Sequence, residues 1–216
     1  MMAINVIINC YRNEFAACKK NWVVFCKSHN MTVIDAINFY RGKPVAENGH
    51  LKRVRNVPFA LFMANLLSIA PQIRASKDFE DLLVILGTVK VKYIGVLTLY
   101  DTALLLSHCS DKKHKAGPKY IYSHAGAEDG LLAICSPVIK KKCKGKSNGG
   151  DKYEIIDLPS PFMASKLSEA QLESLFCTCL ECWKKGKTMV APKGACKNAA
   201  SCMCKLTPPC CFRKLH

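Results

Sequence analysis

Apolar side chains recur at steps of three and four residues over most of the first 180 positions, and this spacing predicts amphipathic helices. The predicted helices cover residues 13–29, the stretch from Thr32 to near Gly42, the stretch after Pro58, residues 77–87, residues 96–108 and the stretch after Ser168. The pattern therefore predicts an all-α fold. We expect a multi-helix domain over residues 1–180, with one helix-hairpin-helix-like turn, and an irregular cysteine-rich extension over residues 181–216.

Polar residues stand where helix caps are needed. Thr32 is followed by Asp35 in the first turn of its predicted helix, and Ser168 is followed at capping-box spacing by Gln171. Ser76 is predicted to cap the helix over residues 77–87, with Glu80 one position beyond the strict capping-box spacing. These side chains would accept hydrogen bonds from the first N–H groups of each helix, which have no partners within the helix.

The connection between the helices over 77–87 and 96–108 is too short to form a strand with a partner. Its residues Val91-Lys92-Tyr93-Ile94-Gly95 predict a tight turn. The whole element, residues 77–108, resembles the helix-hairpin-helix of DNA-repair and other DNA-handling proteins, with Val91, Ile94, Gly95 and Thr98 at matching positions. Tyr93 departs from that motif, which favours glycine there because the backbone approaches phosphate, often at positive φ.

Such a turn suits phosphate binding because the first N–H groups of the following helix point outward at the positive end of the helix dipole. The residues expected to bind nucleic acid at this turn are Lys90, Lys92, Ile94, Gly95, Leu97 and Thr98. The alternative is a structural turn that only packs Ile94 and Leu97.

The charge of the chain favours polyanionic partners. The chain has 32 basic and 16 acidic residues, a formal charge of +16. Residues 1–139 carry 17 basic and 10 acidic side chains, a balance of +7, and residues 140–216 carry 15 and 6, a balance of +9. Nucleic acid is the expected partner of such a surface, and a basic surface that only confers solubility is the alternative.

Two further basic segments lie in predicted loops. Lys112, Lys113, His114 and Lys115 form a short loop that ends at Gly117. Residues 140–150 are rich in lysine and glycine and lack an apolar period, so we expect an exposed loop. The lysines of this loop that would contact a phosphate backbone are Lys140, Lys141, Lys142 and Lys144. A simple linker is the alternative.

Five segments, ENGHLKRV, YIGVLTLYDTA, PKYIYSHAGAEDG, DLPSPF and LSEAQLESLFC, occur in this order within residues 47–177. In order and spacing they resemble a group of small bacterial proteins of unassigned activity. The resemblance implies that the positions of functional interest are His50, Tyr100, Asp101, His124 and Gly126. It supports an alternative hypothesis in which the protein is an enzyme of unknown reaction whose catalytic candidates are His50, Asp101 and His124, with histidine as acid or base.

A base-excision glycosylase of the helix-hairpin-helix kind is disfavoured. Such enzymes need an aspartate about 20 residues after the hairpin, at the start of a helix, to act on a flipped nucleotide. The only acidic residue near that position is Asp111, which lies in the predicted basic loop.

The C-terminal 40 residues hold eight of the 14 cysteines. A zinc site uses four thiolate or imidazole ligands, commonly as two close pairs. Cys179 and Cys182 have C-x₂-C spacing, and Cys202 and Cys204 have C-x-C spacing, so these four residues are one possible Zn site. Disulfides in an oxidising setting and a tail without a defined role are the alternatives, and no cofactor is certain.

No stretch reaches about 18 uninterrupted apolar residues, the length that spans a bilayer, so no membrane segment or membrane partner is expected. The N-terminus has no basic segment before its short apolar run and no small-residue cleavage site, which argues against a signal peptide. We therefore expect an intracellular, cytoplasmic location.

Overall fold

The computed structural model describes Ile8 and residues 30–41, 56–123, 127, 131, 151–154, 156, 158–173 and 175–176. By its internal contacts the chain separates into two compact units. We call residues 22–118 with 201–203 the helical unit, and residues 1–21, 119–200 and 204–216 the mixed unit. The described residues are mainly helical, which confirms the predicted all-α class.

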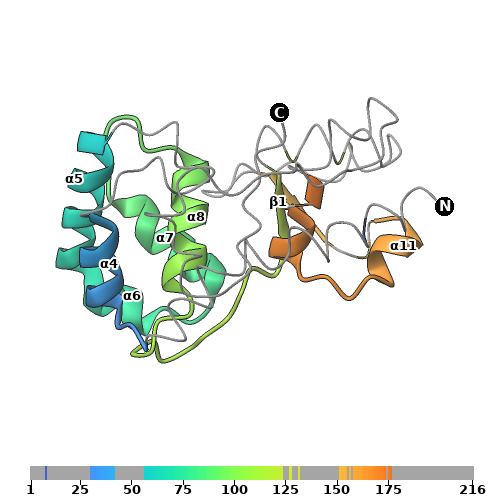
Figure 1. The fold of residues 1–216 in the computed structure, drawn as a ribbon, viewed down its shortest axis with the longest axis horizontal. Coiled ribbons are helices and arrows are strands. Elements are labelled where there is room, and N and C mark those ends of the chain that lie inside the picture. Colours follow the sequence, from blue (N-terminus) through green and yellow to red (C-terminus); the bar gives the residue numbers. More distant parts are fainter. Residues whose placement is uncertain are drawn as a thin grey trace, which may run out of the picture. The chain divides into compact units, whose positions relative to one another are not determined.

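The helical unit contains five α-helices in its described part (Figure 1). They are α4 (Val33–Arg41), α5 (Asn56–Leu66), α6 (Ala70–Ala75), α7 (Phe79–Thr88) and α8 (Val96–Leu106), with a 3₁₀ turn η3 (Leu67–Ile69) between α5 and α6. Helix α4 packs on α5, and α7 packs on α8. The core between these helices is made of fully buried large side chains, among them Tyr40, Phe62, Met63, Leu66, Ile73, Phe79 and Tyr100.

Helix α8 is buried on almost all sides, as its apolar composition predicts. Leu99, Tyr100, Ala103, Leu105 and Leu106 are all at most 9% exposed. The ring of Tyr100 meets the ring of Phe79 on α7 edge to face, with centroids 5.7 Å apart. Burial of large aromatic rings supplies much of a core's stability, so this contact fixes the two helices that flank the turn.

The predicted cap of α4 is confirmed. The Thr32 hydroxyl donates to Asp35 Oδ2 over 2.6 Å, the Thr32 N–H donates to the same oxygen over 3.2 Å, and the Asp35 N–H donates to Thr32 Oγ1 over 3.1 Å. The hydrogen bond from the Thr32 side chain lowers the pKa of Asp35, with the Thr32 backbone N–H adding to the effect. The cap therefore favours the charged carboxylate.

The predicted cap of α7 is wrong by two residues. Asp78, with extended backbone, is the N-cap, and its carboxylate accepts from the Asp81 N–H over 2.8 Å. The Ser76 hydroxyl instead donates to the Ile73 carbonyl at the end of α6, over 2.8 Å. Asp78 and Asp81 have the same spacing as a capping box, and this signal was present in the sequence.

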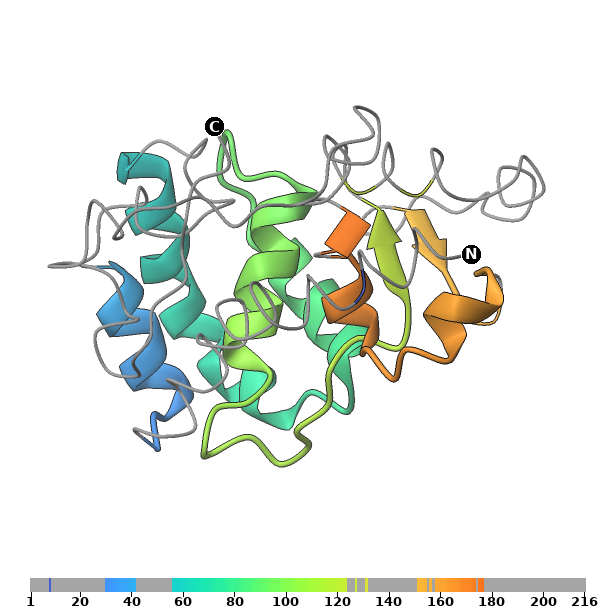
Figure 2. The ribbon, with the colours of Figure 1, turned by 45° about the vertical axis from the view of Figure 1, so that its right-hand side comes forward.

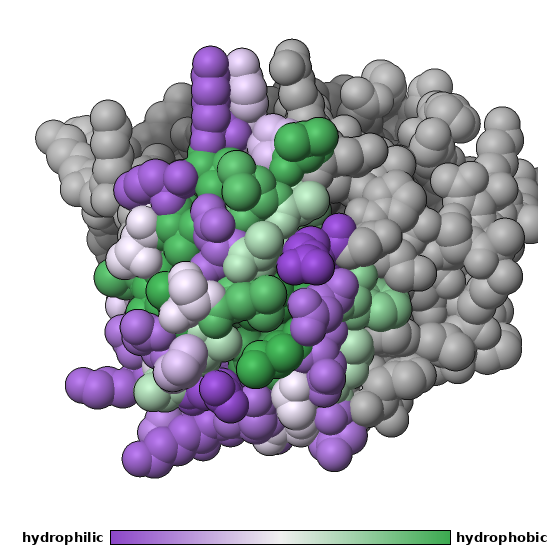
Figure 3. Space-filling view, turned by 90° about the vertical axis from the view of Figure 1, so that its left-hand side faces the viewer, coloured by the Kyte–Doolittle hydropathy of each residue, from purple (hydrophilic) through white to green (hydrophobic). Residues whose placement is uncertain are grey.

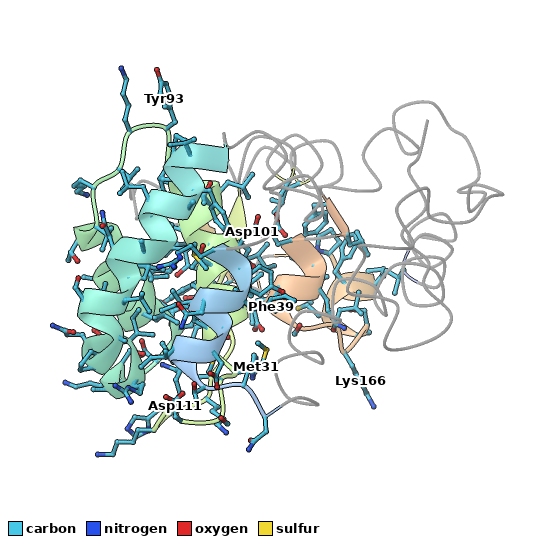
Figure 4. The ribbon with its side chains drawn as sticks, turned by 60° about the vertical axis from the view of Figure 1, so that its left-hand side comes forward. Met31, Phe39, Tyr93, Asp101, Asp111 and Lys166 are labelled. Atoms are coloured by element: carbon cyan, nitrogen blue, oxygen red, sulfur yellow. The ribbon has the colours of Figure 1, made fainter. Side chains whose placement is uncertain are left out.

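The segment that follows α8 forms hydrogen bonds with the start of α4 and with α6 near its end. The Ser110 N–H donates to the Met31 carbonyl over 2.8 Å, and Asp111 Oδ1 accepts from the Val33 N–H over 2.7 Å. Figure 4 shows Asp111 and Met31 at the same end of the helical unit. On the other side, the Lys113 N–H donates to the Arg74 carbonyl over 3.2 Å. This segment, residues 107–113, thereby connects α8 to both α4 and α6.

Lys112 is the buried charged residue of that segment. It is only 5% exposed, although the sequence places it in a run of basic loop residues. Its ammonium group donates to the Ile73 carbonyl over 3.1 Å and to the Ser76 hydroxyl. The lysine thus adds a hydrogen bond to one backbone carbonyl at the end of α6, where helix carbonyls are often capped by basic side chains.

Helix α5 leaves apolar residues on the surface. Val57 is 78% exposed and Leu61, one turn later, is 52% exposed. Figure 3 shows apolar side chains grouped on this face with polar side chains around them. Within the described residues one helical run, Val57–Ala75, is long and apolar enough to cross a membrane, a test that core helices of soluble proteins also pass. This is weak evidence for a membrane segment.

The mixed unit contains two three-residue strands and short helical segments in its described part. Strand β1 (Ile121–Ser123) pairs antiparallel with β2 (Asp151–Tyr153), with Tyr122 opposite Lys152 (Figure 2). The Lys152 ammonium lies 5.1 Å from the ring centroid of Tyr120 and 5.7 Å from that of Tyr122.

The end of the described chain also follows its predicted pattern. In α11 (Ser160–Met163), Phe162 is buried and its ring contacts that of Phe176, with centroids 5.3 Å apart. The Ser168 N–H donates to Gln171 Oε1 over 2.9 Å, and the Gln171 N–H donates back to Ser168 Oγ over 3.4 Å. This capping box confirms the predicted start of the helix after Ser168.

Candidate nucleic-acid interface

The turn between α7 and α8 is closed by its own backbone. The Ile94 N–H donates to the Val91 carbonyl over 3.1 Å, so residues 91–94 form a four-residue turn. Tyr93, at the third position, has φ of 72°, and this left-handed conformation is the one that a type II turn requires there. Tyr93 therefore adopts the positive φ that glycine is favoured for, even though it is a bulky residue.

Gly95 has a different role from the one a glycine usually has in a turn. It is the N-cap of α8, with φ of −104° and ψ of 178°, so its backbone is extended and accessible to any residue. A Cβ atom added at Gly95 would meet nothing within 4 Å. Neither the backbone conformation nor the space around it therefore requires glycine at this position, and the space in front of the helix is open.

The front of α8 has no side-chain cap and no acidic residue in its first turn. Gly95 and Val96 are exposed, so the first turn is open to solvent on that side. Helix N-termini carry partial positive charge and unpaired N–H groups, and both favour an anion. Thr98, in contrast, is only 5% exposed, so its side chain belongs to the interior.

Lys90 and Lys92 are exposed and are the only charged residues between Leu82 and Tyr100. The nearest acidic group along α7 is at its start, and a helix of this length separates that end from the turn by about 15 Å. The Debye length at physiological salt is about 8 Å, so those carboxylates are largely screened from the turn. On α8 the first acidic residue is Asp101, which is buried and about 9 Å along the helix from Gly95. The turn itself, residues 89–97, therefore carries two positive charges and no negative charge.

Tyr93 projects from the tip of this turn, away from the body of the helical unit (Figure 4). It is 56% exposed, and the Lys92 ammonium lies 5.1 Å from its ring centroid. In the sequence, Tyr93 is a departure from the glycine that the helix-hairpin-helix motif favours. The exposure of its ring is visible only in the structure.

The other candidates are divided between the interior and the residues outside the described ranges. Asp101 is described, on α8, and is 4% exposed. His50 and His124 lie outside the described residues, as do Lys140, Lys141, Lys142 and Lys144. The four cysteines of the possible zinc site, Cys179, Cys182, Cys202 and Cys204, lie outside them too. The enzyme and zinc hypotheses therefore remain predictions.

Asp111, the acid closest to the position that a glycosylase would need, is already engaged in the fold. Its carboxylate accepts from the Val33 N–H and lies 3.7 Å from the Arg74 guanidinium. Among the described residues no group of three or more histidine, cysteine, aspartate or glutamate side chains is arranged to hold a metal ion.

No family model matches the chain, and neither a curated protein nor a solved structure matches it. The resemblances to the helix-hairpin-helix motif and to the small bacterial proteins thus remain predictions.

The positive φ at position 93 makes a direct prediction about stability. An L-residue in the left-handed region costs about 1–2 kcal/mol, whereas glycine pays about 0.5–1 kcal/mol of chain entropy instead. We expect Tyr93→Gly to be at least as stable as Tyr93→Ala, by up to about 1 kcal/mol, the reverse of the order in a helix interior. Urea unfolding of the two variants measures this difference. An alanine variant clearly more stable than the glycine variant would contradict the turn geometry.

Proposed function

We propose that the α7–α8 turn binds the phosphate backbone of nucleic acid without sequence preference. The observation that carries this proposal is the exposed, uncapped front of α8, which is flanked by Lys90 and Lys92 and has no acidic residue in its first turn. A phosphate in front of Gly95 would accept hydrogen bonds from backbone N–H groups, and the two ammonium groups would neutralise neighbouring phosphates.

Contacts of this kind position a protein on nucleic acid but do not read its bases. The described side chains at the turn include no amide or carboxylate that would recognise a base edge. The net charge of +16 adds attraction at longer range, which raises the association rate at low salt. The expected behaviour is binding that is weakly dependent on sequence and strongly dependent on salt.

The test compares two variants of equal charge. Lys90→Gln with Lys92→Gln removes two positive charges at the turn, and Lys113→Gln with Lys115→Gln removes two exposed charges from the segment beyond the other end of α8. For a single strand each lost phosphate contact reduces the slope of log affinity against log salt by about 0.7. The first variant should therefore lose about 1.4 from the slope, which corresponds to about 25-fold weaker binding at 0.1 M salt.

The second variant is the matched control and should keep the slope of the wild type. Affinity is measured by fluorescence anisotropy with DNA and RNA oligonucleotides from low to moderate salt. Equal losses in both variants would show that binding depends on total charge and not on the turn. Absence of binding by the wild type at low salt would refute the proposal.

A further inference from the structure

Tyr93 is the one aromatic residue of the turn, and more than half of its side chain is exposed. Its side chain is 56% exposed, and residue 93 has a φ that is costly for any residue except glycine, asparagine or aspartate. The backbone that carries the ring is held in a defined place, because the Ile94–Val91 hydrogen bond closes the turn and both flanking helices are anchored by Phe79 and Tyr100.

The surroundings of the ring match one kind of ligand. The Lys92 ammonium lies over one face of the ring, 5.1 Å from its centroid, and Lys90 is nearby in the chain, while no acidic residue occurs between Leu82 and Tyr100. An exposed aromatic ring flanked by positive charge is the arrangement on which proteins stack the bases of single strands, while basic groups follow the backbone. In a duplex the base faces are already stacked and are not offered to such a ring.

We infer that Tyr93 stacks on an unpaired base, so that the turn selects single-stranded over double-stranded nucleic acid. This inference rests on the proposed function, since the phosphates of the same strand would be held by Lys90, Lys92 and the front of α8. A base lying on the ring brings its own phosphate within reach of the neighbouring lysine. Tyr93 thus distinguishes an unpaired base from a paired one and does not distinguish one kind of base from another.

The experiment uses the whole 216-residue chain and three ligands of equal length, of which the two single strands carry the same number of phosphates. They are a thymidine oligonucleotide of about 20 nucleotides, an abasic strand of equal length and a duplex of equal length. This length exceeds the site sizes of typical single-strand modules. The wild type should bind the thymidine strand about 5- to 150-fold more tightly than the abasic strand, the range expected for one stacked base.

Two substitutions test the ring without disturbing the fold. Tyr93→Gly removes the ring at a position whose backbone suits glycine, so loss of folding is not expected. It should bind the thymidine and abasic strands equally, with the salt dependence of the wild type. Tyr93→Phe keeps the ring and should keep the preference for the thymidine strand.

The outcomes separate this inference from the proposed function. If Tyr93→Gly binds the thymidine strand as tightly as the wild type, or if the wild type does not distinguish it from the abasic strand, the stacking role is refuted. In that case a loss of affinity in the Lys90 and Lys92 variant would still support phosphate binding at the turn. If the wild type binds none of the three ligands at low salt, both proposals fail.

Discussion

Replacing Lys112 with alanine is expected to lower the free energy of unfolding by about 2–3 kcal/mol, because truncating a buried aliphatic chain leaves a cavity. Lys112→Met should be close to neutral, since methionine fills much of the same space. The acceptors that the lysine leaves behind keep other partners. The Ser76 hydroxyl still donates to the Ile73 carbonyl, and that carbonyl also accepts from the Ser76 N–H. Replacing a buried charge with an apolar side chain is often neutral or stabilising.

The pH dependence separates the charge of Lys112 from its packing. Burial lowers the pKa of Lys112 from its usual 10.5, although the nearby Cys109, Asp81, Asp111 and Asp78 act in the opposite direction. Below the lowered pKa both the folded and the unfolded chain hold the proton, and the folded state bears the cost of a buried charge. Between that pKa and 10.5 the unfolded chain holds more of the proton, so the free energy of unfolding rises with pH in this window.

Urea unfolding of the wild type and Lys112→Met at several pH values up to 10.5 measures this effect. The difference between the two proteins removes the contributions of other titrating groups. We expect the wild type to gain stability relative to the methionine variant as pH rises through the window. A difference that is constant with pH, or that falls, would mean that Lys112 is hydrated and not buried.

The second large effect is expected at Asp111. Asp111→Ala should lower the free energy of unfolding by about 1.5–3 kcal/mol, the range for a hydrogen bond to a charged group. The Val33 N–H, at the start of α4, would lose the carboxylate that it now reaches over 2.7 Å. Because Asp111 and Val33 are far apart in the chain, the bond also fixes the start of α4 against the segment after α8.

Arg74→Gln is the matched control for Asp111. It removes the 3.7 Å ion pair with Asp111 but leaves the hydrogen bond to Val33 intact. Exposed ion pairs contribute about 0–1 kcal/mol, so the loss should be much smaller than in Asp111→Ala. Urea midpoints of the two variants give the comparison. Equal losses would show that the ion pair, and not the helix cap, provides the stability.

Parts of the candidate interface could be predicted from the sequence because they depend on neighbours in the chain. The helix predicted over residues 96–108 is observed as Val96–Leu106. The turn before it lies at residues 91–94, within the short glycine-containing connection for which a turn was predicted. Lys90 and Lys92 are exposed as expected for charged loop residues. Thr98 could not be placed in this way, since its burial depends on which face of α8 meets the rest of the unit.

By itself, the sequence determined the helical class, most of the caps and the position of the turn. These features follow from side chains three or four residues apart, such as Thr32 with Asp35 and Ser168 with Gln171, and such contacts form wherever the helix forms. Only the tertiary structure decided that Lys112, within a run of basic loop residues, is buried against Ile73 and that Asp111 caps a distant helix. Their partners lie 39 and 78 residues away in the chain, and that proximity is created by the packing of α4, α6 and α8.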